Sequence, residues 1–291
     1  MFAKMVSDMM IKPGNAPVFG SPTDFDLPFE EVEIPTRDGI TLRGWLIPGE
    51  RDKVIVQSHF GVQCSRSGYT PTGKGPIKLW PEDIPFLRQA RYLNRRGYTV
   101  LMYDLRNHGA SDLGTIPWVT WGPEESKDVV AAVDYVENHP VYGQAAIGLL
   151  SICMGAAATT YAYGQDDGLR GRDNIKAMVA FQPLHYKNFV KAFGLPSFLD
   201  AMGRKKSLER TGIDLNTTTF LPDAKHISVP TLVVQNKNDP WTDLEFVQSY
   251  YDGLTVEKDL LWLDLEASRA ASYEELGRAP EPILSYFDRF L

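Results

Sequence analysis

The sequence predicts an α/β fold, with a mostly parallel twisted sheet, helices on both faces and a helical lid insertion. Short apolar runs of strand length alternate with helical patterns along most of the chain. One such run ends in a tight turn of small residues at 151–155, where a strand is expected to lead directly into a helix. The alternation stops from 183 to 226 and then resumes, which indicates an insertion within a single domain.

The elements follow from the periodicity of the apolar residues. The expected elements before the interruption are strands at 31–35, 40–47 and 53–58, a helix at about 84–96, a strand at 98–104, a helix at 124–138, a strand at 145–151, a helix at 155–163 and a strand at 175–182. Those after it are a strand at 230–235, a helix at 243–253, a strand at 260–265 and a last helix from Pro280. Residues 63–81 contain several Gly and Pro and are expected to form a long loop.

The chain is expected to have three parts. Residues 1–30 form an N-terminal arm, and residues 31–182 and 227–291 together form the core. Residues 183–226 are too many for an ordinary connection in a compact domain, so they are expected to carry their own helices and to act as a lid.

Composition narrows the classes of partner. The chain has 291 residues, 43% of them hydrophobic, a formal charge of −7 and a pI near 5.3. These values fit one large core and exclude a basic surface for nucleic acid, so the expected partner is a small-molecule substrate. No apolar stretch is long enough to span a membrane and no leader pattern opens the sequence, which predicts a cytoplasmic protein. A homodimer is compatible with the composition.

The cysteines and the motif inventory suggest no cofactor. Cys64 and Cys153 are too few for a disulfide framework, and neither lies in metal-ligand spacing. The sequence contains no Gly-rich phosphate loop. We therefore expect neither a metal nor a cofactor.

Cys153 is the expected nucleophile. In a nucleophile elbow the catalytic residue occupies a sharp strand-to-helix turn, and crowding requires small residues two before and two after it. The segment SICMG (151–155) meets this requirement with Cys153 at the apex, whereas Ser151 at the apex would put the large Leu149 at a crowded position. The N–H groups of the following helix favour an anion there. The alternative is a small buried thiol that fills space.

At this point the chain resembles the α/β-hydrolase superfamily, most closely its dienelactone-hydrolase-like and fungal polyketide-transferase-like branches, in which cysteine can be the nucleophile. The resemblance covers roughly residues 31–291. It rests on SHFG (58–61), YDLRNHGAS (103–111), SICMG (151–155) and VPTLVVQNKNDPW (229–241).

The resemblance implies roles for further residues. The backbone N–H of Met154, with that of Gly61 or Phe60, would form an oxyanion hole. Asp239 would be the acid that orients a histidine, although Asp beside Pro240 also suits a simple turn. The remaining matched polar residues, which are expected to be structural, are His59, Asp104, Arg106 and His108.

The histidine of the family's triad is missing. In this fold it follows the last strand, but the loop DLEASRAASYEEL (264–276) contains none. The matching position is about Ser268, with Arg269 beside it. The five histidines, all before Asp239, are His59, His108, His139, His185 and His226.

Three explanations remain open. The first is that Ser268 is an engineered replacement of a native histidine. The second is that His185 supplies the base from the entry to the lid, although a lid histidine that faces solvent or a neighbouring helix is the favoured alternative for that residue. The third explanation is that the protein no longer hydrolyses its substrate. Without a base to activate water, an acyl-enzyme on Cys153 would persist for acyl transfer, condensation or cyclisation. A catalytically inactive binding protein is the alternative of a different class.

The lid segment is rich in aromatic residues. Tyr186, Phe189 and Phe193 have helical spacing, which usually indicates core contacts, but a lid also faces the site. Trp121 lies in a loop that the resemblance places near the same edge of the sheet. Tyr186, Phe189 and Trp121 therefore predict a bulky apolar acyl substrate, carried as an ester or thioester.

Overall fold

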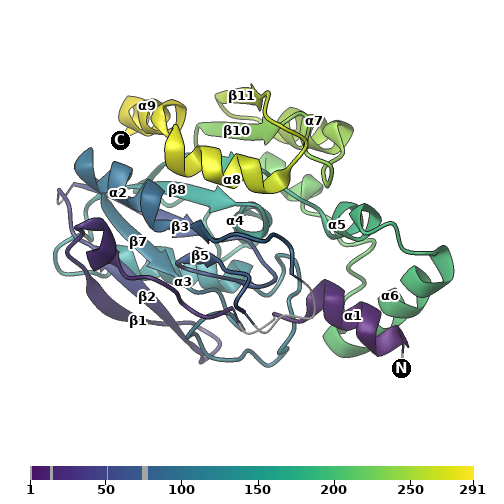
Figure 1. Ribbon diagram of the computed structural model, residues 1–291. Coiled ribbons are helices and arrows are strands. Elements are labelled where there is room, and N and C mark those ends of the chain that lie inside the picture. The colour runs from purple at the N-terminus through teal and green to yellow at the C-terminus, as the bar shows by residue number, and fades with distance from the viewer. Residues whose placement is uncertain (1, 14–15, 51, 74–77) are drawn as a thin grey trace.

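A computed structural model describes residues 2–13, 16–50, 52–73 and 78–291 (Figure 1). Its main sheet has eight strands in the order β1-β2-β7-β3-β8-β9-β10-β11. The β1–β2 and β2–β7 pairs are antiparallel and the other pairs are parallel. The strands are β1 (Glu30–Pro35), β2 (Thr41–Ile47), β3 (Lys53–Ser58), β7 (Thr99–Tyr103), β8 (Ala146–Ile152), β9 (Ile175–Phe181), β10 (Thr231–Asn236) and β11 (Lys258–Leu263). This mostly parallel sheet confirms the predicted fold class.

Helices surround the sheet, with α2 against α8 and α3 against α4. The helices are α1 (Phe2–Ile11), α2 (Leu87–Arg95), α3 (Ser126–Glu137), α4 (Met154–Gly164), α5 (Tyr186–Ala192), α6 (Ser197–Thr211), α7 (Leu244–Gly253), α8 (Arg269–Arg278) and α9 (Glu281–Phe290), with short 3₁₀ turns η1 (Pro22–Phe25) and η2 (Leu221–His226). The central strands β7 and β8 are covered on both faces, which explains their nearly continuous apolar runs.

Residues 63–81 are not simply the long loop that we expected. The strands β4 (Cys64–Ser65), β5 (Gly68–Tyr69) and β6 (Ile84–Pro85) form a small antiparallel sheet. Gly68 has φ +116°, and a Cβ there would overlap the carbonyl oxygen of Ile84, so only glycine allows this pairing. Residues 74–77 of the predicted loop lie outside the described residues.

The expectation of a loop over 264–276 is wrong for its second half, because α8 begins at Arg269. The Ser268 hydroxyl accepts the N–H of Ala271 at 3.4 Å and caps the helix. Tyr273 and Leu276, three residues apart, form part of its buried face. Because Arg269 is the first residue of α8, the helix fixes the direction of its side chain.

The insertion and the N-terminal arm pack together. Residues 183–226 carry α5, α6 and η2, and α6 lies along α1 at one end of the molecule (Figure 1). A Cβ on Gly203 of α6 would lie 2.3 Å from the Cγ1 atom of Val6, so α1 packs directly against the backbone of α6. The Ser207 hydroxyl donates to the Ser7 hydroxyl at 3.1 Å. The arm is therefore part of the same packed unit as α6. Residues 1, 14 and 15 of the arm lie outside the described residues.

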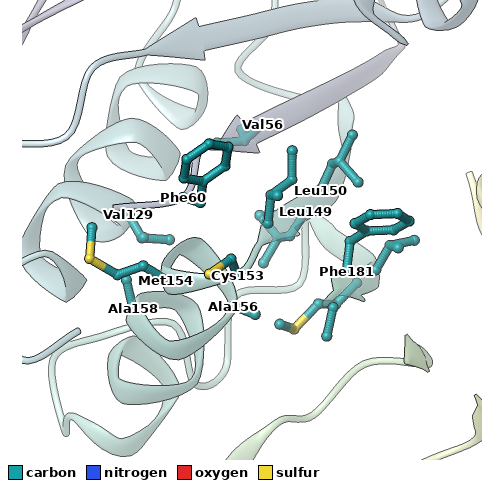
Figure 2. Packing of buried hydrophobic residues seen from close by; sticks show 14 of the residues in the cluster. Val56, Phe60, Val129, Leu149, Leu150, Cys153, Met154, Ala156, Ala158 and Phe181 are labelled. Carbon is teal, nitrogen blue, oxygen red and sulfur yellow. The ribbon is translucent and has the colours of Figure 1, made fainter. Parts of the chain in front are cut away.

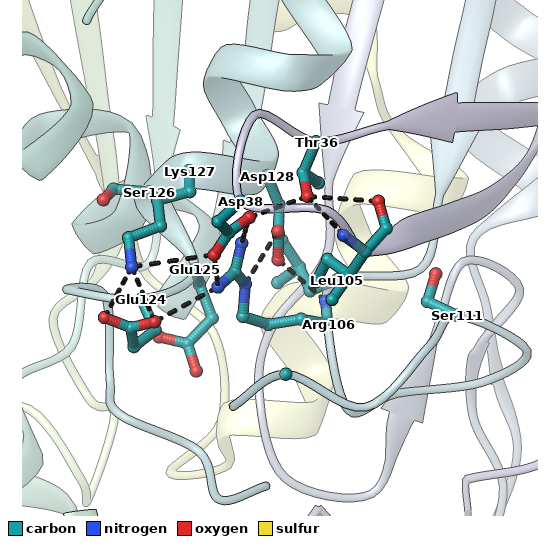
Figure 3. A network of polar contacts seen from close by, with 12 residues as sticks. Thr36, Asp38, Leu105, Arg106, Ser111, Glu124, Glu125, Ser126, Lys127 and Asp128 are labelled. Atoms are coloured by element: carbon teal, nitrogen blue, oxygen red, sulfur yellow. Dashed lines mark hydrogen bonds and ion pairs between the residues drawn. The ribbon is translucent and has the colours of Figure 1, made fainter. Parts of the chain in front are cut away.

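A buried network around Arg106 fixes the loop after β7 (Figure 3). The Arg106 guanidinium donates to Asp128 and Asp38 at 2.8 Å each, and to Glu124 at 3.2 Å. Burial alone would raise the pKa of Asp38, but hydrogen bonds from Arg106 and Thr36 outweigh it and lower that pKa to about 2. These contacts join the loop to α3 and to the β1–β2 turn, as expected for a structural arginine.

Candidate active site

Cys153 occupies the single residue between β8 and α4, at the carboxyl edge of the sheet (Figure 2). Its backbone has φ 55° and ψ −106°, a conformation that costs an L-residue about 1–3 kcal/mol. Its N–H donates to the carbonyl of Phe181 at 2.8 Å. A Cβ on Gly155 would lie 2.5 Å from the carbonyl oxygen of Ser58, which explains the small residue two positions after the apex. Strain of this kind gathers at functional sites.

Ser151 lies below the turn and not at its apex. Its hydroxyl shares a 2.8 Å hydrogen bond with that of Thr159 and is buried. Cys153 is itself only 4% exposed, so a substrate reaches the sulfur only if the covering side chains move.

Gly61 and Met154, two of the residues expected in an oxyanion hole, lie together. A Cβ on Gly61 would overlap the Sδ of Met154. Met154 is the first residue of α4, and the first four N–H groups of a helix have no partner within it. The Phe60 ring stacks on the ring of Tyr273 with centroids 4.8 Å apart. The structure thus brings the loop after β3 to the nucleophile turn.

Arg269 contacts the acid at the place where the family has a histidine. Its side chain is buried and pairs with Asp239. Its Nη1 also donates to the Thr242 hydroxyl at 3.0 Å, its Nη2 to the Gln182 carbonyl at 2.5 Å and its Nε to the Tyr273 hydroxyl at 2.8 Å. Four of the five guanidinium N–H donors are thus assigned.

The sulfur of Cys153 neighbours both Arg269 and Tyr273. Burial opposes the charge of Arg269, but Tyr273, Asp239 and Cys153 outweigh that penalty and raise its pKa. Burial raises the pKa of Tyr273 well above its usual value, although Arg269 acts against this. Both side chains therefore keep their protons at neutral pH, so Arg269 can only donate to the sulfur, and the Tyr273 hydroxyl has a proton to donate to it.

Asp239 is held by several donors at once. Besides Arg269, its carboxylate accepts the N–H of Trp241 at 3.0 Å, the hydroxyl of Thr242 at 2.7 Å and the amide of Gln235 at 3.3 Å. The expected acid thus lies in the site, paired with an arginine in place of a histidine.

Sequence reasoning missed Arg269 and Tyr273 as site residues. The family's histidine position corresponds to about Ser268, but the Ser268 hydroxyl caps α8. The neighbouring residue, Arg269, is the one that reaches Asp239. Recognition of α8 would have provided the signal, because Arg269 and Tyr273 are one helical turn apart and share a face.

His185 is engaged elsewhere. Its Nδ1 accepts the N–H of Lys187 at 3.1 Å and caps α5, while its Nε2 lies 2.7 Å from the Thr218 carbonyl. Since Nδ1 accepts, Nε2 carries the proton and donates to that carbonyl. Burial lowers the pKa of His185. Its neutral ring holds the insertion in place and has neither nitrogen free.

The three aromatic residues predicted to bind substrate join the core to the insertion. Trp121 packs on Tyr186 and Phe189 with centroids 5.8 and 4.7 Å away, and its indole N–H donates to the Met10 carbonyl at 3.1 Å. Of the three, Phe189 lies closest to the site, because it contacts Trp241 at 5.4 Å.

Trp241 separates the buried site from an open cavity. Its ring stacks on Trp80 at 5.4 Å and lies 5.9 Å from the Arg269 guanidinium. A cavity of about 660 Å³ adjoins it, between α5 and the loop after β10. Its lining includes Asn188, Lys191, Trp241, Thr242 and Glu245.

The described residues have neither a cluster suited to a metal ion nor a membrane-spanning helix. They contain no group of three or more His, Cys, Asp or Glu side chains that could hold a metal ion. Within the same ranges, no helix combines the length and the apolar character needed to cross a membrane.

The sheet order and the strained strand-to-helix turn define an α/β-hydrolase fold. The esterase Pf2001 of Pyrococcus furiosus superposes with a TM-score of 0.68 at 24% identity, over 96% of this chain and 98% of that one. Together with the curated relatives below, it confirms the predicted resemblance to the α/β-hydrolase superfamily. No protein-family model matches the chain.

The curated relatives come from fungi. The polyketide transferase grgF of a Penicillium species is 28% identical over 159 residues, which cover 54% of this chain and 46% of the relative. The thiohydrolase apmlB of Arthrinium phaeospermum is 26% identical over 202 residues, which cover 69% of this chain and 58% of the relative. The chain thus matches about half the length of these relatives.

Proposed function

We propose that the protein is an acyl-transfer enzyme that uses Cys153 as nucleophile and no histidine base. The observation that carries the proposal is the convergence of two proton-keeping donors, Arg269 and Tyr273, on a cysteine held at a strained nucleophile turn. The names of the relatives, polyketide transferase and thiohydrolase, support acyl chemistry.

In this mechanism the sulfur of Cys153 is the nucleophile, and Arg269 and Tyr273 lie beside it as hydrogen-bond donors. An electron pair of the sulfur forms a bond to the acyl carbon, and the carbonyl π electrons move to oxygen, facing the N–H groups of Met154 and of Gly61 or Phe60. When the carbonyl reforms, the bond to the leaving group breaks and its electron pair departs with that group. The thiol proton passes to solvent as the sulfur attacks, and the leaving group takes a proton from solvent as it departs.

Arginine does not replace the missing base. A guanidinium stays protonated in proteins, so Arg269 cannot take a proton from water. A general base typically contributes about 10² to 10⁴ in rate, and hydrolysis of the acyl-enzyme is slowed accordingly. The acyl group then awaits an acceptor with a stronger nucleophile, which favours transfer or cyclisation over hydrolysis.

The aromatic cover supports a bulky apolar acyl group. Phe60 and Tyr273 stack near the sulfur, and Trp80 and Trp241 stack beside them. In this proposal the substrate enters the cavity of about 660 Å³, displaces the Trp241 side chain that lines it, and so reaches Cys153. Residues 183–226 serve as the lid in this proposal, since α5 lines that cavity through Asn188 and Lys191.

The test is intact mass after exposure to a panel of activated aryl esters and thioesters. We expect a stable acyl adduct on the parent protein and none on Cys153→Ala. Cys64→Ala is the matched control, because Cys64 is the second buried cysteine and lies in β4, outside the turn 151–155, and it should retain the adduct. Fast turnover without an adduct would contradict the missing-base mechanism.

A binding protein is the second candidate, favoured by the 4% exposure of Cys153 beneath the aromatic cover. It predicts no adduct and no turnover with any member of the panel, and identical ligand binding by the parent and Cys153→Ala.

A further inference from the structure

Gln182 directly follows β9 and lies against the site through its backbone. Its carbonyl accepts Nη2 of Arg269 at 2.5 Å, and its N–H donates to the Val234 carbonyl at 2.8 Å. The preceding residue, Phe181, accepts the N–H of Cys153. Gln182 thus directly follows Phe181, the residue whose carbonyl binds the backbone N–H of Cys153.

The backbone of Gln182 is strained. Its φ is 53°, in the left-handed region that an L-residue with a long side chain rarely adopts. Within the described residues only seven non-glycine positions have positive φ, and Cys153 is another of them. Two strained residues on adjacent strands at the carboxyl edge mark this edge as functional.

The side chain of Gln182 has no partner among the described residues. It is completely buried, and neither its Oε1 nor its Nε2 makes a hydrogen bond with any of them. The nearby Gln235 differs, because its Nε2 donates to Asp239. A buried amide without partners destabilises the fold, whereas an apolar side chain of the same shape would not. The fold thus maintains a costly group on a residue whose backbone carbonyl contacts Arg269 in the site.

We propose that the Gln182 amide is a recognition group for the acyl substrate. This inference rests on the proposed function and specifies its substrate class. An amide presents one acceptor and one donor side by side, so it complements a ligand that also carries a donor next to an acceptor. The substrate is therefore an acyl chain with an amide, or with a hydroxyl close to its carbonyl, rather than a plain hydrocarbon chain.

The test measures binding and needs no chemistry. Octanamide carries the donor and acceptor pair, and nonan-2-one has a similar length but only the acceptor. By isothermal titration on the full chain, we expect octanamide to bind about tenfold or more tightly than nonan-2-one, because the ketone leaves part of the buried amide unpaired. Gln182→Met should remove this preference.

Thermal unfolding separates recognition from a structural role. Gln182→Met should raise the Tm by about 2 °C or more, since it removes an unpaired buried amide and keeps the side-chain length. Tyr163→Phe is the control, because the Tyr163 hydroxyl is also buried without a partner among the described residues, near the far end of α4. It should raise the Tm but keep the preference for octanamide.

Equal binding of the two ligands by the parent, or a preference that survives in Gln182→Met, would overturn the proposal. A lower Tm for Gln182→Met would do the same, since it would show that the amide supports the fold. If the preference is found but Cys153 is never acylated, the recognition site stands and the acyl-transfer proposal fails.

Discussion

Arg106 and Arg269 are the two most deeply buried arginines among the described residues, and their surroundings are opposite. Arg106, after β7, meets three carboxylates, those of Asp38, Glu124 and Asp128 (Figure 3). Arg269, at the start of α8, meets only the carboxylate of Asp239. Its other assigned donors go to the neutral oxygens of Thr242, Gln182 and Tyr273.

The difference lies in the balance of charge. Each guanidinium has four assigned N–H donors, but all four of those on Arg106 go to carboxylate oxygens, which ties three segments together. Asp239 is the single carboxylate at Arg269, whose other three assigned donors go to neutral oxygens and whose guanidinium also neighbours the sulfur of Cys153. A buried arginine is thus structural when carboxylates surround it, and it is available for chemistry when a nucleophile is its remaining neighbour.

Loss of Arg106 should have the largest effect, and it should be on stability. Arg106→Met leaves Asp128 buried without its partner, which is expected to cost about 3–5 kcal/mol in the free energy of unfolding, measured by urea denaturation. Alkylation of Cys153 in the folded fraction should keep its rate. A large loss of that rate would show that the two arginines act together.

Arg269→Lys should mainly affect reactivity. Lysine keeps the positive charge beside Asp239 but loses the planar fork that joins Asp239, Gln182 and Tyr273. We expect the rate of acyl-adduct formation on Cys153 to fall by about 10². Urea denaturation should show a smaller loss of stability than for Arg106→Met, and the reverse order would refute the contrast.

Tyr273→Phe should have a smaller effect on the same reaction. It removes the hydroxyl that neighbours the sulfur but preserves the ring that stacks on Phe60. Loss of one neutral donor is expected to slow acylation by about tenfold. Tyr250→Phe is the matched control, because the Tyr250 hydroxyl is bonded to that of Thr160 and not to the site. An unchanged acylation rate in Tyr273→Phe would show that the Tyr273 hydroxyl plays no part in the reaction.

Asp38→Asn should give the smallest effect, visible in the pH dependence of stability. The pKa of Asp38 is lowered from its ordinary value of 3.8 to about 2 in the folded protein. Its stabilising contribution is therefore complete above about pH 4 and is lost as the pH falls through 2. Because the carboxylate is partly exposed, we expect about 1 kcal/mol or less, measured as a shallower loss of stability in Asp38→Asn between pH 4 and 2. If the stability of the parent and that of Asp38→Asn fall equally between pH 4 and 2, the prediction is wrong.

The sequence predicted most of the fold because its strands carry a local signal. All eight strands of the main sheet lie within two residues of their predicted positions. The position of Cys153 followed from a steric rule, and the contact of Gly155 with Ser58 shows the crowding behind that rule.

The rest depended on contacts that no local pattern encodes. The packing of α1 on α6 joins Ser7 to Ser207, which lie far apart in the sequence. The role of Arg269 was not predicted, because the resemblance implies a histidine in the loop after the last strand. Arg269 instead reaches Asp239 from α8, a helix that the periodicity did not predict. The neighbours of His185 likewise became visible only in three dimensions.

The burial of Cys153 also bears on how the protein survives oxidants. Thiolates oxidise to sulfenic and higher acids according to their charge and their accessibility. A sulfur that is 4% exposed beneath stacked aromatic rings is protected from peroxide while the site is closed. In the proposed acyl transfer the same rings would therefore protect the sulfur between turnovers, and damage should accumulate chiefly while substrate holds the site open.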